Sequence, residues 1–217
     1  MRRPQRYTSF ARAYDVLSGE WPVYRAGRVT GIGALQLRPG ALVLDIGCGT
    51  GLNIPLILEA VGPTGHIIGV DASANMLAQA RAKAQRRGWL NVDLKDADAT
   101  TLTPGWLNGR LSQEHRKDGA EAVLFTYSLS VMRNWPEAWR AATAAARPGA
   151  RVAVVDMRTP TGTAAALAPL ARLACMLGGS DITAHPWTAL ERDCTDVQAW
   201  SLRGGHIQVR AGTLNKP

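Results

Sequence analysis

The sequence has little of several features that would indicate particular classes of protein. Its 217 residues include only three cysteines, Cys48, Cys175 and Cys194, which lie far apart and have no accompanying histidine cluster. Such spacing favours neither a disulfide framework nor a zinc site. We therefore predict no bound metal and a reducing compartment, the cytoplasm.

Long apolar runs are also missing. The nearest one, from Thr163 to Leu177, is rich in alanine but is interrupted by Pro169 and Arg172, and it falls short of the roughly 20 apolar residues that a membrane-spanning helix needs. The N-terminus, residues 1–6, is basic, but no apolar stretch follows it as in a secretory signal. We therefore expect a soluble protein.

A block of like charges is absent as well, although the net charge is high. The chain carries 25 Lys and Arg against 17 Asp and Glu, a net charge of +8, which permits attraction to nucleic acid, acidic lipid or an acidic small molecule. The positive residues are scattered, and the cluster at residues 81–87 fits the end of a helix. Nucleic acid is therefore not the expected partner.

What the sequence does contain is an alternation of short apolar runs with helical patterns. Strands are predicted at residues 41–46, 66–70, 91–97, 120–127, 151–157, 197–202 and 206–211, and helices at 52–61, 73–87, 136–146, 163–177 and 187–193. This alternation favours a parallel sheet with helices on both faces, closed by an antiparallel hairpin at the glycine turn 203–205. We predict one α/β domain over residues 1–217, a Rossmann-like, doubly wound, seven-stranded sheet from residue 41 with a helical cap over residues 1–40.

Turn-forming residues mark the breaks between these elements. Pro148 and Gly149 are predicted to stop a helix before the fifth strand, and the polar residues 103–119 are predicted to form a loop. Ser73 is placed to cap the helix that follows it.

The most informative segment runs from Val43 to Gly51, with the sequence Val-Leu-Asp-Ile-Gly-Cys-Gly-Thr-Gly. An apolar strand leads into an acidic residue and then into three glycines at alternate positions. Glycine permits a sharp turn from strand to helix and a close approach of the backbone to a ligand, and the following helix offers unpaired amide groups. The segment therefore predicts a cofactor loop, in which Cys48 is a small filler and not a nucleophile.

Two acidic residues indicate which cofactor fits. Asp71 lies twenty positions after Gly51, at the tip of the second predicted strand, where a carboxylate can accept hydrogen bonds from both hydroxyls of a ribose. Gly49 and Gly51 are only two positions apart, whereas the dinucleotide fingerprint spaces its last two glycines by about three. Asp45 would also repel a pyrophosphate but attract the ammonium group of a methionine moiety. These features favour an adenosyl cofactor over a nicotinamide dinucleotide.

The motifs resemble those of a known family. Residues 43–51 look like the first motif of the class I S-adenosylmethionine-dependent methyltransferases, and residues 69–77 look like the second. Asp98 and Ala99 are similar to the third, in which an acidic side chain meets the adenine amino group, and residues 125–132 take the place of the fourth. The resemblance covers about residues 41–157 and implies S-adenosyl-L-methionine as the cofactor. The core residues assigned to its binding are Asp45, Gly47, Cys48, Gly49, Gly51, Asn53, Asp71, Ala72, Met76, Asp98 and Ala99, with Asp96 as an alternative to Asp98.

The cap and the predicted edge of the sheet complete the candidate site. Tyr14 followed by Asp15 resembles the start of the quinone-biosynthesis and phospholipid N-methyltransferases, where this pair lies beside the cofactor. The further candidates for cofactor contact are Tyr14, Tyr24, Arg28 and Tyr127, with plain packing as the alternative for the cap residues. The catalytic candidates are Tyr14, Tyr127, Ser130 and, as a base, His185, whereas His115 and His206 are expected to be structural or solvated.

The resemblance implies methyl transfer by in-line displacement, which needs a base only where the acceptor is a hydroxyl or an acidic carbon. Thr126-Tyr127-Ser128-Leu129 differs from the Asn-Pro-Pro-Tyr or Asp-Pro-Pro-Tyr segment of amino-methylating nucleic-acid enzymes, and no Pro-Cys nucleophile is present. The expected acceptor is therefore a small molecule, a quinone precursor or a lipid headgroup.

Two questions stay open at this point. The apolar helix from Ala164 to Leu177 is similar in placement to a helix of the lipid and quinone enzymes, and it either covers the sheet or makes a peripheral contact with a membrane. The competing functions are a nucleic-acid methyltransferase, supported only by the charge of +8, and a cofactor-binding regulator without turnover.

Overall fold

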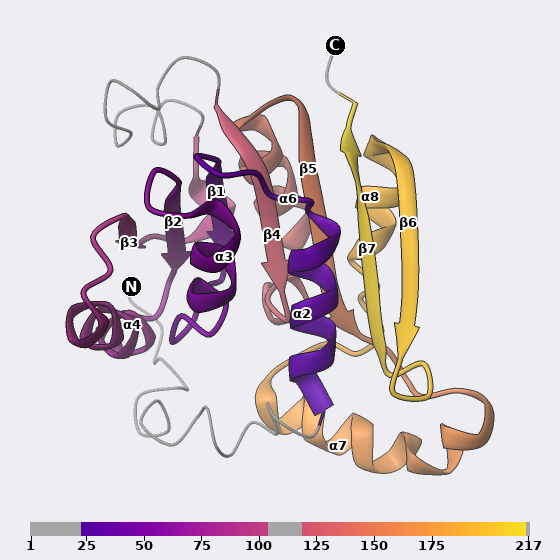
Figure 1. Ribbon diagram of the computed structural model, residues 1–217. Helices are drawn as coiled ribbons and strands as arrows, with labels where there is room; N and C mark the ends of the chain where they lie inside the picture. Colours follow the sequence, from indigo (N-terminus) through magenta and orange to yellow (C-terminus); the bar gives the residue numbers. More distant parts are fainter. Residues whose placement is uncertain (1–22, 104–118, 216–217) are drawn as a thin grey trace.

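The computed structural model describes residues 23–103 and 119–215, which form a seven-stranded sheet between two layers of helices (Figure 1). The strands are β1 (Leu42–Ile46), β2 (His66–Asp71), β3 (Val92–Asp96), β4 (Ala120–Thr126), β5 (Ala146–Met157), β6 (Cys194–Leu202) and β7 (Ile207–Leu214). The helices are α2 (Arg25–Ala34), α3 (Ile54–Val61), α4 (Ala74–Arg87), α6 (Trp135–Ala144), α7 (Ala168–Gly178) and α8 (Trp187–Asp193), with 3-10 turns η2 (Ala99–Thr101), η4 (Leu129–Val131) and η5 (Gly162–Leu167).

The strand order is β3-β2-β1-β4-β5-β7-β6. The first five strands are parallel, and β7 is inserted antiparallel between β5 and β6, so the predicted fold class and hairpin are confirmed. The chain winds outward from β1 to β3 and then returns to the other side of β1 with β4. Loops diverge at such a reversal, and the carboxyl ends of β1 and β4 therefore border the place where open α/β sheets bind ligands.

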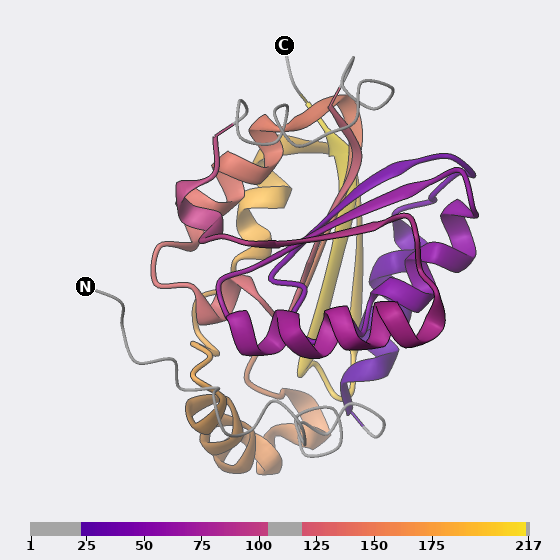
Figure 2. The same ribbon diagram turned by 90° about the vertical axis from the view of Figure 1, so that its left-hand side faces the viewer.

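Helices α2 and α3 cover one face of the sheet, and α6 and α8 cover the other (Figures 1 and 2). β5 is buried on both faces: Val152 and Val154 belong to the core under α6 and α8, whereas Ala153 packs in the core under α2 and α3. Helix α2 lies unusually close to the sheet because Gly31 has no side chain. A Cβ there would be only 2.3 Å from the side chain of Val155.

The local signals for α4 are confirmed. The hydroxyl of Ser73 accepts a hydrogen bond from the backbone amide of Met76 at 3.4 Å, as an N-cap does. At the other end the helix stops at Gly88, whose φ of 65° is the left-handed conformation of a helix C-cap.

Two predicted elements differ from the structure by a division or by more than three residues. The single helix expected over residues 163–177 is divided into η5 and α7, because Pro169 fits the first turn of a new α-helix and not the interior of a longer one. The fifth strand begins at Ala146, five residues earlier than expected. Its pairing with β4 jumps from Ala146 to Arg151, so Pro148 and Gly149 form a bulge within the strand instead of preceding it.

Helix α7 packs against the end of the sheet through Cys175 and Ala171 and covers neither of its faces, so the first of the two readings of this segment holds only in part. It lies across the end of the sheet at which β4 and β5 terminate (Figure 1), and Cys175 is its one buried residue. In the part of the chain that the structure describes, none of the helices has the length and apolar character needed to cross a membrane. Residues 104–118 of the expected loop, His115 included, and residues 1–22 of the cap, Tyr14 included, lie outside the described residues.

Candidate functional site

The loop after β1 has the backbone conformation that its glycines predict. Gly47, Gly49 and Gly51 have φ angles of 74°, 56° and 81°, which residues with side chains rarely adopt. A Cβ at Gly47 would lie 2.3 Å from Cβ of Ser128, so this loop is in close contact with the turn after β4. A Cβ at Gly49 would meet no described atom within 4 Å, so the loop has room for a ligand on that side.

Asp71, at the end of β2, is tied to this loop. The backbone amide of Gly49 donates to Oδ2 of Asp71 at 2.8 Å, and the amide of Ser73 donates to Oδ1 at 2.8 Å. Burial raises the pKa of Asp71, these two hydrogen bonds lower it, and the neighbouring Asp96 raises it again. Each carboxylate oxygen has taken one amide and can accept a second donor, which suits the two hydroxyls of a ribose.

Asp45 lies at the centre of a buried polar network. Its side chain is fully buried, Oδ1 accepts a hydrogen bond from Asn53 Nδ2 at 2.7 Å, and Oδ2 has no partner among the described residues. Asn53 in turn accepts a hydrogen bond from the guanidinium of Arg28 on α2. The network therefore joins the strand β1, the start of α3 and the helix α2.

The unpartnered oxygen of Asp45 is the feature that best fits a cationic ligand. Burial raises its pKa to about 7, although the Asn53 hydrogen bond and the charge of Arg28 limit the rise. A buried acceptor without a donor is costly, whereas an ammonium group at Oδ2 would lower the pKa and stabilise the carboxylate. The residues present thus fit the methionine end of S-adenosylmethionine.

The residues expected to bind the adenine differ in their burial. Met76 and Ala99 are buried, whereas Ala72, Asp96 and Asp98 are exposed. Asp98 caps η2 by accepting from Thr100 at 2.9 Å through the backbone amide and at 2.7 Å through the hydroxyl. Asp96 pairs in register with Asp71 on the neighbouring strand, so both acidic alternatives lie near the end of β3.

Tyr24 and Tyr127 form an aromatic wall beside the end of β4. Their rings meet edge to face with centroids 4.9 Å apart, and the hydroxyl of Tyr127 donates to the backbone carbonyl of Tyr24 at 2.8 Å. The guanidinium carbon of Arg28 lies 5.8 Å from the centre of the Tyr127 ring. Tyr127 has a φ of 55°, a costly conformation that often occurs at ligand sites.

Ser130 leads to a buried carboxyl that the sequence analysis missed. The amide of Ser130 donates to Oδ2 of Asp156 at 3.0 Å, and the amide of Met157 donates to Oδ1 at 2.8 Å. Burial raises the pKa of Asp156 to about 6, and hydrogen bonds from both neighbours oppose the rise. The available signal was an acidic residue at the end of an apolar strand, because parallel strands end at the same edge of a sheet.

Two histidines occupy different surroundings. The ring of His185 packs against Trp187 at 4.8 Å, and Trp187 belongs to the core under α6 and α8. His206 is 8% exposed and lies at the start of β7 with its ring 6.2 Å from that of Tyr24. The sequence singled out His185 as a base, but the histidine ring that lies beside Tyr24 of the aromatic wall is that of His206.

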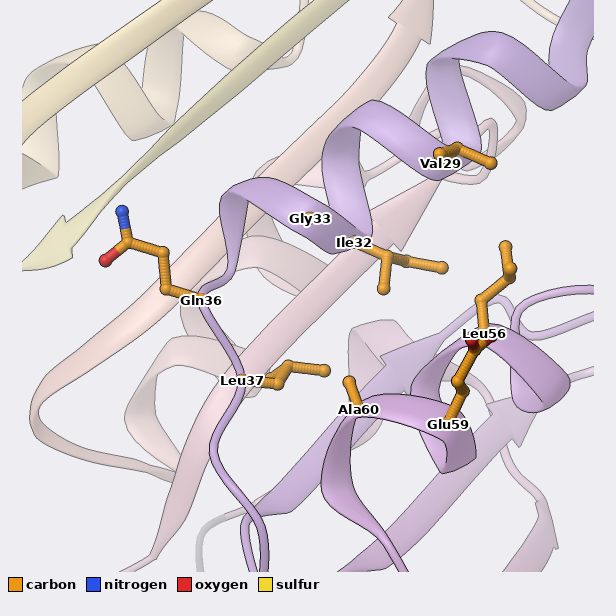
Figure 3. Close-up of a pocket in the computed structure, with 8 residues that line it drawn as sticks. All are labelled: Val29, Ile32, Gly33, Gln36, Leu37, Leu56, Glu59 and Ala60. Atoms are coloured by element: carbon orange, nitrogen blue, oxygen red, sulfur yellow. The ribbon is translucent and has the colours of Figure 1, made fainter.

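A separate groove of about 380 Å³ lies between α2 and α3 (Figure 3). It is lined by Val29, Ile32, Gly33, Gln36, Leu37, Leu56, Glu59 and Ala60. None of the candidate cofactor or catalytic residues takes part in it, so we do not identify this groove with the site at the carboxyl end of the sheet.

Neither the cysteines nor the described side chains of metal-binding type indicate a second reactive or metal-binding site. All three cysteines are buried, and burial raises the pKa of Cys175 to about 11 and that of Cys194 to about 12. Within residues 23–103 and 119–215, no three His, Cys, Asp or Glu side chains are grouped so that they could hold a metal ion.

Comparison with known proteins agrees with this geometry. Residues 43–150 match the family model described as a methyltransferase domain. The chain is 27% identical over 150 residues to the demethylmenaquinone methyltransferase of Bacillus cytotoxicus. The aligned residues make up 68% of this chain and 59% of that protein. It is 30% identical over 151 residues to the arsenite methyltransferase of Halobacterium salinarum, and this alignment takes in 67% of this chain and 35% of that protein. The chain thus spans less than two thirds of the length of either relative.

Among solved structures, a SAM-dependent methyltransferase from Aquifex aeolicus has the same fold. Its TM-score is 0.62 at 14% identity, and the match covers 94% of this chain and 98% of that one. Similarity at this identity concerns the fold alone.

Proposed function

Because the chain belongs to the class I S-adenosylmethionine-dependent methyltransferases, with S-adenosylmethionine as its cofactor, we propose that it methylates a hydroxyl-bearing aromatic small molecule of the quinone-precursor class. The proposal rests on the contact between the glycine loop and the turn after β4. The glycine loop after β1 contacts the turn after β4, and that turn holds Tyr127, whose ring packs against Tyr24 at the start of α2. A cofactor site and an aromatic surface therefore share one edge of the sheet.

The chain's own residues have distinct tasks in this proposal. Asp71 binds the ribose hydroxyls, Oδ2 of Asp45 receives the ammonium group, and the buried Met76 packs beside the adenine. When bound, the cofactor supplies a methyl group on a positively charged sulfur. The protein then accelerates transfer mainly by fixing the acceptor in line with that methyl group and keeping water away.

The aromatic wall supports a flat aromatic acceptor over the other classes. Aromatic rings pack favourably edge to face or offset against one another, and Tyr24 and Tyr127 already do so. Arsenite, the acceptor named for one relative, binds thiolates, but the three thiols of this chain are buried and their pKa values are raised.

The test is calorimetric titration with S-adenosylmethionine, S-adenosylhomocysteine and NADH, on the native protein and on Asp71→Ala. We expect micromolar binding of both adenosyl compounds, lost in Asp71→Ala and kept in Glu59→Ala, which removes an exposed carboxylate from α3, the helix that follows the glycine loop. Transfer of labelled methyl groups is then measured with naphthols, lipid headgroups and RNA. Binding of NADH alone, or binding without transfer to any acceptor, would count against the proposal.

We also propose that α7 makes a peripheral contact with an anionic membrane surface. Five large apolar side chains of η5 and α7 are exposed, by 47% to 76%: Leu167, Leu170, Leu173, Met176 and Leu177. Arg172 lies among them, and the net charge of +8 adds a long-range attraction to anionic lipid. Since α7 crosses the end of the sheet that carries the site, such a contact would bring a lipophilic acceptor close to it (Figure 1).

Sedimentation with vesicles tests this contact. We expect binding to phosphatidylglycerol vesicles that weakens in Leu170→Asp/Leu173→Asp. The matched control is Leu90→Asp, because Leu90 is 95% exposed but lies between α4 and β3. Equal binding of both variants would show that α7 is not the contact.

A further inference from the structure

His206 is a buried titratable group to which the proposed mechanism gives no task. It is 8% exposed, although it precedes β7 at a hairpin turn, where side chains are usually exposed. The hairpin places it beside the end of β5, because Ile207 pairs with Met157. His206 therefore lies at the edge of the sheet that carries the candidate site.

One hydrogen bond fixes the protonation of the neutral ring. Nδ1 of His206 lies 2.7 Å from the backbone carbonyl oxygen of Arg158, and a carbonyl oxygen can only accept. The proton of the neutral imidazole is therefore on Nδ1, and Nε2 carries the lone pair. Nε2 has no hydrogen-bond partner among the described residues.

The ring also continues the aromatic wall. The centroid of His206 lies 6.2 Å from that of Tyr24, which lies 4.9 Å from that of Tyr127. Tyr127 immediately follows β4, and the turn after β4 contacts the glycine loop. The glycine loop, the aromatic wall and His206 therefore follow one another along the same edge of the sheet, and in our proposal the acceptor lies on the wall with its hydroxyl between the methyl group and Nε2.

We infer that His206 is the general base that removes the acceptor's hydroxyl proton, an inference that rests on the proposed methyl transfer to a hydroxyl-bearing aromatic molecule. The hydroxyl gives its proton to Nε2 while its oxygen forms a bond to the methyl carbon. The bond between that carbon and sulfur breaks, and its electron pair stays on sulfur. The proton on Nε2 then passes to solvent.

The surroundings of the ring suit this task. The charged residues on the adjoining segments are the exposed Arg158 and Arg203, the buried Asp156 on β5, and, on α2, the exposed Arg25 and the buried Arg28. The phenol groups of Tyr24 and Tyr127 are the other titratable neighbours. The carbonyl bond to Nδ1 holds the ring in one orientation, as the third member of a catalytic triad does.

His206→Asn separates the base from the structural role. The amide of asparagine can still donate to the Arg158 carbonyl in the place of Nδ1, but it has no basic nitrogen. With 1-naphthol as the acceptor, we expect kcat to fall about 100-fold, the acidic limb of the pH profile to disappear, and added imidazole to restore part of the rate. The control His66→Asn changes a histidine at the start of β2 and is expected to leave all three unchanged.

A second readout does not depend on turnover. Nitrogen-15 NMR of the imidazole rings, assigned with His206→Asn, should show Nε2 of His206 without a proton, and the Nε2 signal should move when 1-naphthol is added with S-adenosylhomocysteine. A protonated Nε2, or no movement with 1-naphthol, overturns the inference even if the native protein transfers no methyl group. An unchanged rate and pH profile in His206→Asn overturns it while leaving the proposed function intact.

Discussion

The two halves of the sheet differ in how tightly the sequence specifies them. In the cofactor half, β1 to β3, the glycine loop takes its conformation from its own residues. A buried hydrogen bond from a residue eight positions away in sequence holds Asp45, and a partly buried one from Gly49 holds Asp71. In the acceptor half, β4 to β7, the site is assembled from α2, the turn after β4 and the start of β7, and α7 leaves most of its apolar side chains exposed. A cofactor half specified locally and an acceptor half assembled from distant segments can change separately, which is one way in which a single fold can serve many acceptors.

The largest expected effect is on the cofactor loop. Gly47→Ala forces a Cβ into contact with Ser128 at a φ of 74°, so we expect S-adenosylmethionine affinity to fall at least about 100-fold. Gly178→Ala on α7 is the matched control, because a Cβ there meets no described atom within 4 Å and should leave binding unchanged. Calorimetry distinguishes them, and native affinity in Gly47→Ala would mean that this loop does not hold the cofactor.

Each half contains one buried carboxyl group that should make the free energy of unfolding depend on pH. Asp45 and Asp156 have pKa values raised to about 7 and about 6 from 3.8, so the native protein keeps a proton that the unfolded chain releases. The free energy of unfolding therefore falls as pH rises from 4 through these values, by at most about 4 and about 3 kcal/mol respectively.

Replacing each carboxyl by an amide should remove its share of this slope. Denaturant titrations between pH 4 and 8 measure it for Asp45→Asn and Asp156→Asn. Saturating S-adenosylmethionine should flatten the slope that belongs to Asp45 and leave that of Asp156, since only Asp45 faces the proposed ammonium. A ligand effect on both slopes would contradict the division into two halves.

Side-chain packing on α4 and α7 is expected to give a smaller difference between the two halves. Leu77 on α4 is fully buried, and Leu77→Ala should lower the free energy of unfolding by about 2–4 kcal/mol. Leu177 on α7 is 76% exposed, and Leu177→Ala should change it by less than about 0.5 kcal/mol. Urea unfolding of the two variants checks this, and similar losses would mean that α7 is covered in solution.

The smallest effect concerns the aromatic wall. Tyr127→Phe removes the hydrogen bond to the Tyr24 carbonyl and should cost about 1 kcal/mol of unfolding free energy, measured by thermal unfolding. In the sequence analysis Tyr127 is a candidate for cofactor contact, but our proposal assigns it to the acceptor side, so the affinity for S-adenosylhomocysteine should change little. A large loss of that affinity would move Tyr127 into the cofactor half.

The cofactor half could be predicted from the sequence because its main features depend on residues that are close together in the chain. The glycine positions, the cap at Ser73 and the strand before Asp45 depend on neighbouring residues, and all of these local features agree with the structure. The division at Pro169 and the bulge at Pro148 were missed, because both residues were read as marks of helix interruption or ending and not as parts of the next element.

By itself, the sequence determined the fold class, the glycine loop and the acidic residues at the ends of β1 and β2, since these follow from periodicity and from backbone preferences of single residues. Only the tertiary structure decided that Arg28 reaches Asn53, that Asp156 lies behind Ser130, and that His206 rather than His185 adjoins the aromatic wall. Partners in these contacts are separated by 25 or more residues along the chain. Which distant side chains meet depends on strand order and register, and no local pattern in the sequence encodes either of them.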